Sequence, residues 1–150
     1  MTRHNGKPSY EYQIIIAAAP ADVWRGLIDG DLTRQYVYGT RFESALEKGA
    51  PYAFVGEGSF NVVTGEILEV ETRKRLSMSW NAHWDASVDK DPASRVTYEL
   101  DAMGPSTRLR VVHDGFESET ATYIGSADSW PVMLSSLKTL LESGKPLVTG

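Results

Sequence analysis

The strongest hydrophobic pattern in the chain lies close to its C-terminal end, between Asp128 and Ser143. Large apolar residues recur there every three or four positions, which places them on one stripe of a helix; they are Trp130, Met133, Leu134, Leu137, Leu140 and Leu141. Pro131 suits the first turn of such a helix, and Gly144 followed by Pro146 is typical of its end. The pattern therefore predicts a helix over residues 128–143 that buries one apolar face.

Most of the chain before this helix alternates between apolar and polar residues, which is the period of a strand with one buried face. The strands are expected at residues 10–17, 40–44, 52–55, 59–71, 76–80, 96–100 and 109–113. Within the longest of these runs the apolar positions change parity near Gly65, which indicates a bulge or a bend. Successive strands with one apolar face each predict an antiparallel sheet.

A helical period interrupts this alternation between the first two strands. Pro20 suits a first turn, and the next apolar residues fall on one face of a short helix that Gly30 ends: Val23, Trp24, Leu27 and Ile28. Asp31 is placed to cap a second short helix, which Gly39 closes. The order of elements predicts an α+β fold, in which a curved antiparallel sheet of six to seven strands wraps around the long C-terminal helix.

Composition narrows the class of protein. The length of 150 residues suits one domain (residues 1–150), in which residues 1–9 form a flexible polar arm. The absence of cysteine excludes disulfides and thiol chemistry, and it fits a cytoplasmic location. With a net charge of −5 and no cluster of Lys and Arg, the chain is not expected to bind nucleic acid. No apolar run reaches membrane-spanning length, so no membrane partner is expected either.

Six local stretches carry a family resemblance: residues 19–24 (Ala-Pro-Ala-Asp-Val-Trp), 65–70, 75–80, 94–100, 107–116 and 129–131 (Ser-Trp-Pro). They resemble the START-like, or SRPBCC, superfamily, whose helix-grip fold is that of the birch pollen allergen. Within it they are most similar to the branch named after the activator of heat-shock-protein-90 ATPase. The resemblance covers about residues 10–144 and implies the helix-grip fold. It leaves the activity open, because members include ligand carriers, cyclase-like enzymes and chaperone cofactors.

Few residues are placed for chemistry. His113 shares a strand face with Leu109 and Val111, so we expect it under the helix, either as a structural histidine or as an acid–base group. His83 and Asp85 share a face if their strand continues, but no further ligands stand at a recognisable spacing, so no metal site is expected. There is no nucleophile elbow and no phosphate-binding loop, and no cofactor is expected.

The aromatic residues point instead to a ligand pocket. Bulky rings gather on the faces assigned inward, where each ring taken alone is better explained as core. Together they can line a cavity, because a curved sheet and a helix do not fully interdigitate unless bulky groups fill the gap. We expect the pocket walls to include Phe54, Trp80, Tyr98, His113, Trp130 and Leu134. The first hypothesis is therefore a non-enzymatic START-like domain that binds a small apolar or aromatic molecule.

Two alternatives belong to other classes. One is an enzyme of the cyclase or dehydratase kind that uses His113 and a tyrosine as the acid–base pair. The other is a protein-interaction or chaperone-associated module that uses the outer face of the sheet, for which an exposed apolar patch is expected. The outer residues assigned by parity are polar, which weakens this last hypothesis: Ser77, Ser79, Thr97, Glu99, Arg108 and Arg110. Either a monomer or a weak homodimer is compatible with the sequence.

Overall fold

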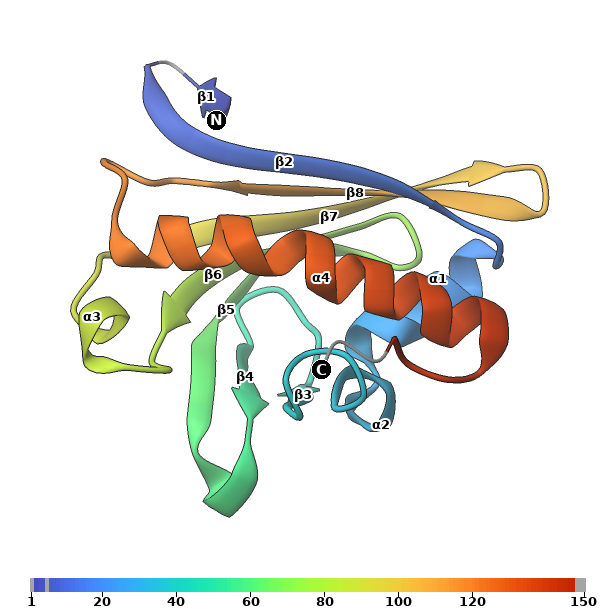
Figure 1. Ribbon diagram of the computed structural model, residues 1–150, viewed down its shortest axis with the longest axis horizontal. Helices are drawn as coiled ribbons and strands as arrows, with labels where there is room; N and C mark the ends of the chain where they lie inside the picture. The colour runs from blue at the N-terminus through green and yellow to red at the C-terminus, as the bar shows by residue number, and fades with distance from the viewer. Residues whose placement is uncertain (1, 5, 148–150) are drawn as a thin grey trace.

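The computed structural model describes residues 2–4 and 6–147. Within these residues eight antiparallel strands form one sheet, in the order β1-β2-β8-β7-β6-β5-β4-β3. The strands are β1 (Thr2–His4), β2 (Lys7–Ile16), β3 (Arg41–Ser44), β4 (Pro51–Val55), β5 (Asn61–Glu71), β6 (Arg75–Ala82), β7 (Ser94–Met103) and β8 (Ser106–Asp114). Figure 1 shows the curved sheet with the long helix α4 (Ala121–Ser143) lying along one face. The predicted helix-grip fold is confirmed, and the three-residue β1 is the addition to the expected strands.

Two short helices follow β2, as the sequence predicts. Pro20 occupies the first turn of α1 (Pro20–Ile28), and Asp29 caps α2 (Gly30–Thr33), where the expected cap was Asp31. The segment after β6, for which the sequence pattern predicted no element, contains a further short helix, α3 (Ala86–Asp89), which Asp85 caps. A single turn of 3-10 helix, η1 (Glu57–Ser59), joins β4 to β5.

The long helix begins earlier than predicted. It starts at Ala121, after a Thr120 cap, so Pro131 lies inside the helix and not in its first turn; the predicted end at Gly144 is confirmed, with φ of 82°. An interior proline normally costs about 3 kcal/mol, which is why the sequence pattern favoured a start beside it. The added turns are held by a distant residue, because the Thr122 amide and hydroxyl both donate to Asp91 Oδ2, at 3.0 and 2.7 Å.

The same added turns explain why the first strand begins early. β2 starts at Lys7, where the pattern predicted Tyr10, and β1 pairs with its first residues. The Tyr123 hydroxyl of α4 donates to the Ser9 carbonyl at 3.2 Å, and Ser9 is buried. In this part, residues 2–4 and 7–9, the arm expected to be flexible is therefore paired strand.

Gly65 is required by close packing, and the bulge lies further along β5. The register of β5 against β6 shifts between Ile67 and Glu69. At Gly65 a Cβ atom would lie 2.2 Å from the Ser79 carbonyl oxygen and 2.6 Å from the ring of Tyr52. The Tyr52 hydroxyl also donates to this Ser79 oxygen, at 2.6 Å. Tyr52 is the partner of Gly65 on the neighbouring strand β4, so its ring lies across the glycine to reach β6.

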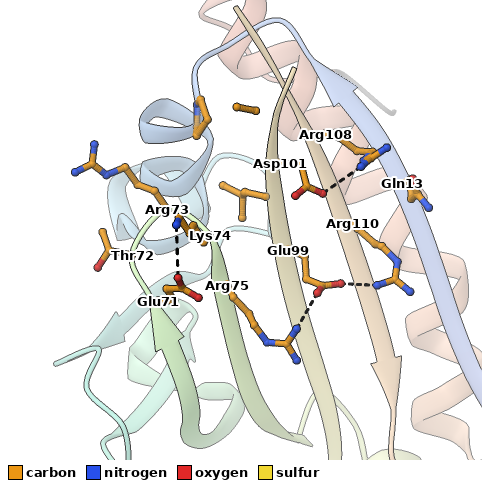
Figure 2. A pocket seen from close by; sticks show the side chains of 13 residues that line it. Gln13, Glu71, Thr72, Arg73, Lys74, Arg75, Glu99, Asp101, Arg108 and Arg110 are labelled. Carbon is orange, nitrogen blue, oxygen red and sulfur yellow. Dashed lines mark hydrogen bonds and ion pairs between the residues drawn. The ribbon is translucent and has the colours of Figure 1, made fainter. Parts of the chain in front are cut away.

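Charged side chains cover the outer face of the sheet. Glu99 on β7 accepts from Arg75 on β6, at 2.7 Å, and from Arg110 on β8; the two arginines reach on to Glu69 and Glu11. Figure 2 shows Glu99 between the two guanidinium groups. The core therefore lies on the opposite face, under α1 and α4, where the apolar strand residues meet the helical stripe. Among the described residues no helix is long and apolar enough to cross a membrane.

Candidate functional site

A pocket of about 380 Å³ lies between α4 and strands β4 to β6. The helix contributes one wall, the strands contribute the other, and the loops after α2 and β6 form the mouth. The lining residues are Val37, Tyr38, Thr40, Phe54, Val62, Val63, Trp80, Trp84, Ser126, Ser129, Trp130 and Met133. None of these side chains is acidic or basic, so the pocket is an apolar, largely aromatic space with a few hydroxyl and indole groups.

Three of the six predicted wall residues line this pocket: Phe54, Trp80 and Trp130. The other three, Tyr98, His113 and Leu134, lie outside this lining and are buried in the core. Tyr98 packs the edge of its ring against Trp130, with ring centroids 6.0 Å apart, and burial raises the pKa of its hydroxyl.

Several pocket residues come from the start of α4 and from the loops, and these were not predicted from the sequence. Ser126 precedes the predicted helix start at residue 128, whereas in the structure it lies on α4 with Ser129, and both line the pocket. A signal was available, because Ser126 and Trp130, like Ser129 and Met133, are spaced i, i+4 and therefore share a helix face. Tyr38 and Trp84 at the mouth carry no such signal.

The aromatic rings form a continuous wall. The Trp80 ring lies 5.8 Å from Phe54 and 5.7 Å from Trp130, between centroids, and it meets the His113 ring at 5.5 Å. Phe54 continues the wall to Phe42, at 5.2 Å. Tilted and edge-on contacts of this kind hold rings in place and add to the burial of their area.

His113 serves this wall as a hydrogen-bonding partner. The Trp130 indole N–H donates to His113 Nδ1 at 3.1 Å, so Nδ1 carries no proton. In the neutral ring the proton is therefore on Nε2, which donates to the Ser94 hydroxyl at 2.8 Å; that hydroxyl donates in turn to the Trp80 carbonyl, at 3.4 Å. Burial lowers the pKa of His113 to about 3, against a smaller opposing effect of the Asp114 charge. Of the two roles left open by the sequence, these contacts favour the structural one.

Two polar groups of the pocket have no such partner. Within residues 2–4 and 6–147, no hydrogen bond is made by Trp80 Nε1 or by Ser126 Oγ, although Trp80 is only 5% exposed and Ser126 only 4%. A buried donor or acceptor left unpaired costs about 1–3 kcal/mol, so such groups are rare in folded proteins. Both residues line the same pocket.

His83 belongs to a different, open hollow on the surface, beside Phe60 and Trp84. Its Nε2 lies 2.8 Å from Thr64 Oγ1 and its Nδ1 lies 2.6 Å from Asp89 Oδ1, whereas Asp85 binds the start of α3. In the part of the chain that the structure describes, no three His, Asp or Glu side chains come together as metal ligands.

A larger hollow of about 1110 Å³ lies on the outer face, around the turn between β5 and β6 and over β7 and β8 (Figure 2). It is polar, and four of its basic side chains, those of Lys74, Arg75, Arg108 and Arg110, pair with carboxylates. Lys74 lies 3.7 Å from Glu71, and Arg108 lies 3.3 Å from Asp101. This pairing suits a solvated sheet surface better than an apolar interface.

The chain matches one protein family over most of its length. The family described as Activator of Hsp90 ATPase homolog 1-like protein matches residues 17–142, from the end of β2 to the last turn of α4. The chain belongs to this family. No match is found among curated proteins.

Solved structures agree with this fold. Protein MLL2253 from Mesorhizobium loti is 27% identical, with a TM-score of 0.75 over 90% of this chain and 97% of its own. CalU16 from Micromonospora echinospora is 22% identical, with a TM-score of 0.72 over 91% of this chain and 77% of its own. The Aha1 dimer from Colwellia psychrerythraea is 20% identical, with a TM-score of 0.73 over 92% of this chain and 98% of its own.

Membership of the Activator of Hsp90 ATPase homolog 1-like family establishes the architecture around the pocket and leaves its use open. Proteins of one fold carry unrelated activities, and activity depends on the site. For this chain the site is an uncharged aromatic pocket, with a neutral histidine behind its wall.

Proposed function

We propose that this protein binds a small apolar or aromatic molecule in the pocket between α4 and strands β4 to β6, without transforming it. The observation that carries the proposal is the pocket itself, whose volume of about 380 Å³ is in the range of small-molecule sites. Aromatic and aliphatic side chains dominate its lining, and they favour an apolar ligand because its transfer from water buries apolar surface.

The enzymatic alternative has less support. Proton transfer needs a titratable group within reach of the ligand. The lining holds no His, Asp, Glu or Lys, and its one tyrosine, Tyr38, is exposed at the mouth. His113 lies outside this lining, and both of its ring nitrogens are engaged.

The protein-interaction alternative is also less supported, because ion pairs and not apolar side chains cover the outer sheet face. We propose that the protein acts in the cytoplasm, which its lack of cysteine supports. We propose a monomer or a weak homodimer, the latter because one structural relative is described as a dimer.

A pocket-filling variant tests the proposal. Ser129→Phe places a ring at the pocket, and Ser135→Phe is its matched control, because Ser135 is a half-buried serine of the same helix that does not line the pocket. Uncharged aromatic compounds should raise the Tm of the wild type and of Ser135→Phe, but not of a folded Ser129→Phe. Equal responses of the three proteins would refute binding in this pocket.

A further inference from the structure

We propose that the ligand is an uncharged aromatic molecule that carries a hydrogen-bond acceptor such as a carbonyl oxygen, and that Trp80 and Ser126 donate to it. This inference rests on the proposed function, and it adds the polar contact and the charge that the ligand must have. Its basis is the pair of unpartnered buried groups, which come from opposite walls: Trp80 from β6 and Ser126 from α4.

The two buried indoles of the pocket, those of Trp80 and Trp130, show that the missing bond is specific to the Trp80 ring. Trp80 and Trp130 have almost equal burial, at 5% and 3% exposure, and their rings are in contact. The N–H of Trp130 is satisfied by His113, whereas the N–H of Trp80 has no acceptor anywhere in the described residues. An indole N–H only donates, so the group that completes this site must be an acceptor.

Ser126 on α4 is the second buried group without a hydrogen-bond partner in the described residues. A serine inside a helix often donates to the carbonyl four residues earlier, but the Ser126 hydroxyl makes no such bond within residues 6–147. Its position one turn before Trp130 places it on the pocket face of α4. Both atoms are covered by neighbouring atoms in this structure, so a ligand held between helix and sheet pairs with these two donors, one on each side, after a small shift of the side chains around it.

The absence of charge in the lining determines the charge of the ligand. A carboxylate or an ammonium group that left water would lose its hydration, and none of the lining side chains carries the opposite charge. An acceptor without charge avoids this penalty, which selects ketones, esters, amides or ethers over acids. The bound molecule is therefore an aromatic compound of this neutral kind.

Three probes of similar shape test each part: 9-fluorenone, which has the carbonyl; fluorene, which lacks it; and fluorene-9-carboxylate, which is charged. Affinities are measured by calorimetry for the wild type, Trp80→Phe and Ser126→Ala, with Trp24→Phe as a control, because Trp24 is buried on α1 and does not line the pocket. The indole N–H signals of the same proteins are followed by NMR.

We expect the wild type to bind fluorenone more tightly than fluorene, and the carboxylate most weakly. Trp80→Phe and Ser126→Ala should each lose about three- to tenfold in affinity for fluorenone, the effect of one hydrogen bond, and keep their affinity for fluorene. The N–H signal of Trp80 should move with fluorenone and much less with fluorene. A purely structural role of these groups would leave the ketone preference unchanged.

The outcomes separate this inference from the proposed function. If fluorenone and fluorene bind equally, or if both variants keep the ketone preference, the pocket binds ligands but the hydrogen-bonding inference is wrong. If the carboxylate binds most tightly, the inference on charge is wrong. If no probe binds the folded wild type, the proposed function fails together with this inference.

Discussion

His113 makes the stability of this protein sensitive to acid in a way that can be calculated. The imidazole is fully buried, and its Nδ1 accepts the N–H of Trp130. A proton on Nδ1 would break this bond and place a positive charge among aromatic rings, with the Asp114 carboxylate as the nearby countercharge, itself held by Arg95 at 2.7 Å. Burial therefore lowers the pKa of His113 from 6.5 to about 3.

The sign of the effect follows from this lowered pKa. Below pH 6.5 the unfolded chain takes up a proton at this histidine, while the folded protein does not do so until about pH 3. The contribution of neutral His113 is thus complete above pH 6.5 and is lost as the pH falls. The loss approaches about 1.4 kcal/mol per pH unit in this window, which amounts to about 2 kcal/mol between pH 7 and pH 5.

Urea denaturation at pH 7 and pH 5 checks this value by comparing the wild type with His113→Gln, which cannot titrate. The free energy of unfolding of the wild type should fall by about 2 kcal/mol more than that of the variant. The carboxylates that titrate in the same range are common to both proteins and cancel. His83→Gln is the control, because His83 is partly exposed beside Asp89. An equal loss in the wild type and in His113→Gln would show that His113 is not held neutral by the fold.

Two further predictions concern the sheet. Gly65→Ala should destabilise the fold by about 1–3 kcal/mol, because the added Cβ meets backbone at Ser79 that cannot move aside. Urea denaturation measures this loss against the control Gly125→Ala, whose Cβ meets only the Trp84 side chain. Equal stabilities of the two variants would contradict the prediction. Glu99→Gln should cost about 1 kcal/mol at low ionic strength and less in 1 M NaCl, because two arginines lose their common carboxylate. Glu71→Gln, with its single exposed Lys74 partner, should change little, and a loss independent of salt at Glu99 would rule out the electrostatic explanation.

The sequence predicted those elements whose residues face one large neighbouring surface. The stripe from Trp130 to Leu140 and the alternation in β6 to β8 place the apolar residues on the core side, so their periods are visible in the sequence. The buried residues on the other face of β6 and β7, Ser77 and Thr97, are polar and do not interrupt this pattern. The start of α4 depends on Asp91, which lies far from it in the chain, and local propensity at Pro131 pointed elsewhere. Long-range contacts of this kind leave no periodic signal.

Parity also predicted the pocket only in part. It assigns a residue to a face of the sheet, and on that basis Phe54, Trp80, Tyr98 and His113 are equivalent. The structure then separates them, because the pocket borders Phe54 and Trp80, whereas Tyr98 and His113 lie outside its lining and are buried in the core. Tertiary packing decides which inward residues border the pocket and which are fully packed in the core. The alternation in the sequence therefore does not distinguish the two groups.

Nothing in the sequence indicated which of the two buried pocket tryptophans forms a hydrogen bond within the protein. This difference connects the fold to the proposed site. Trp80 and Trp130 are alike in the sequence, but the histidine on β8 satisfies only one of them. His113 therefore maintains the wall by accepting from Trp130, and Trp80 keeps its donor for the ligand. If this division is correct, the two positions separate experimentally: His113→Gln changes stability and its pH dependence, whereas Trp80→Phe changes affinity for a ketone probe. A variant at either position that altered both properties equally would mean that the two indoles act as one structural unit, without a reserved donor.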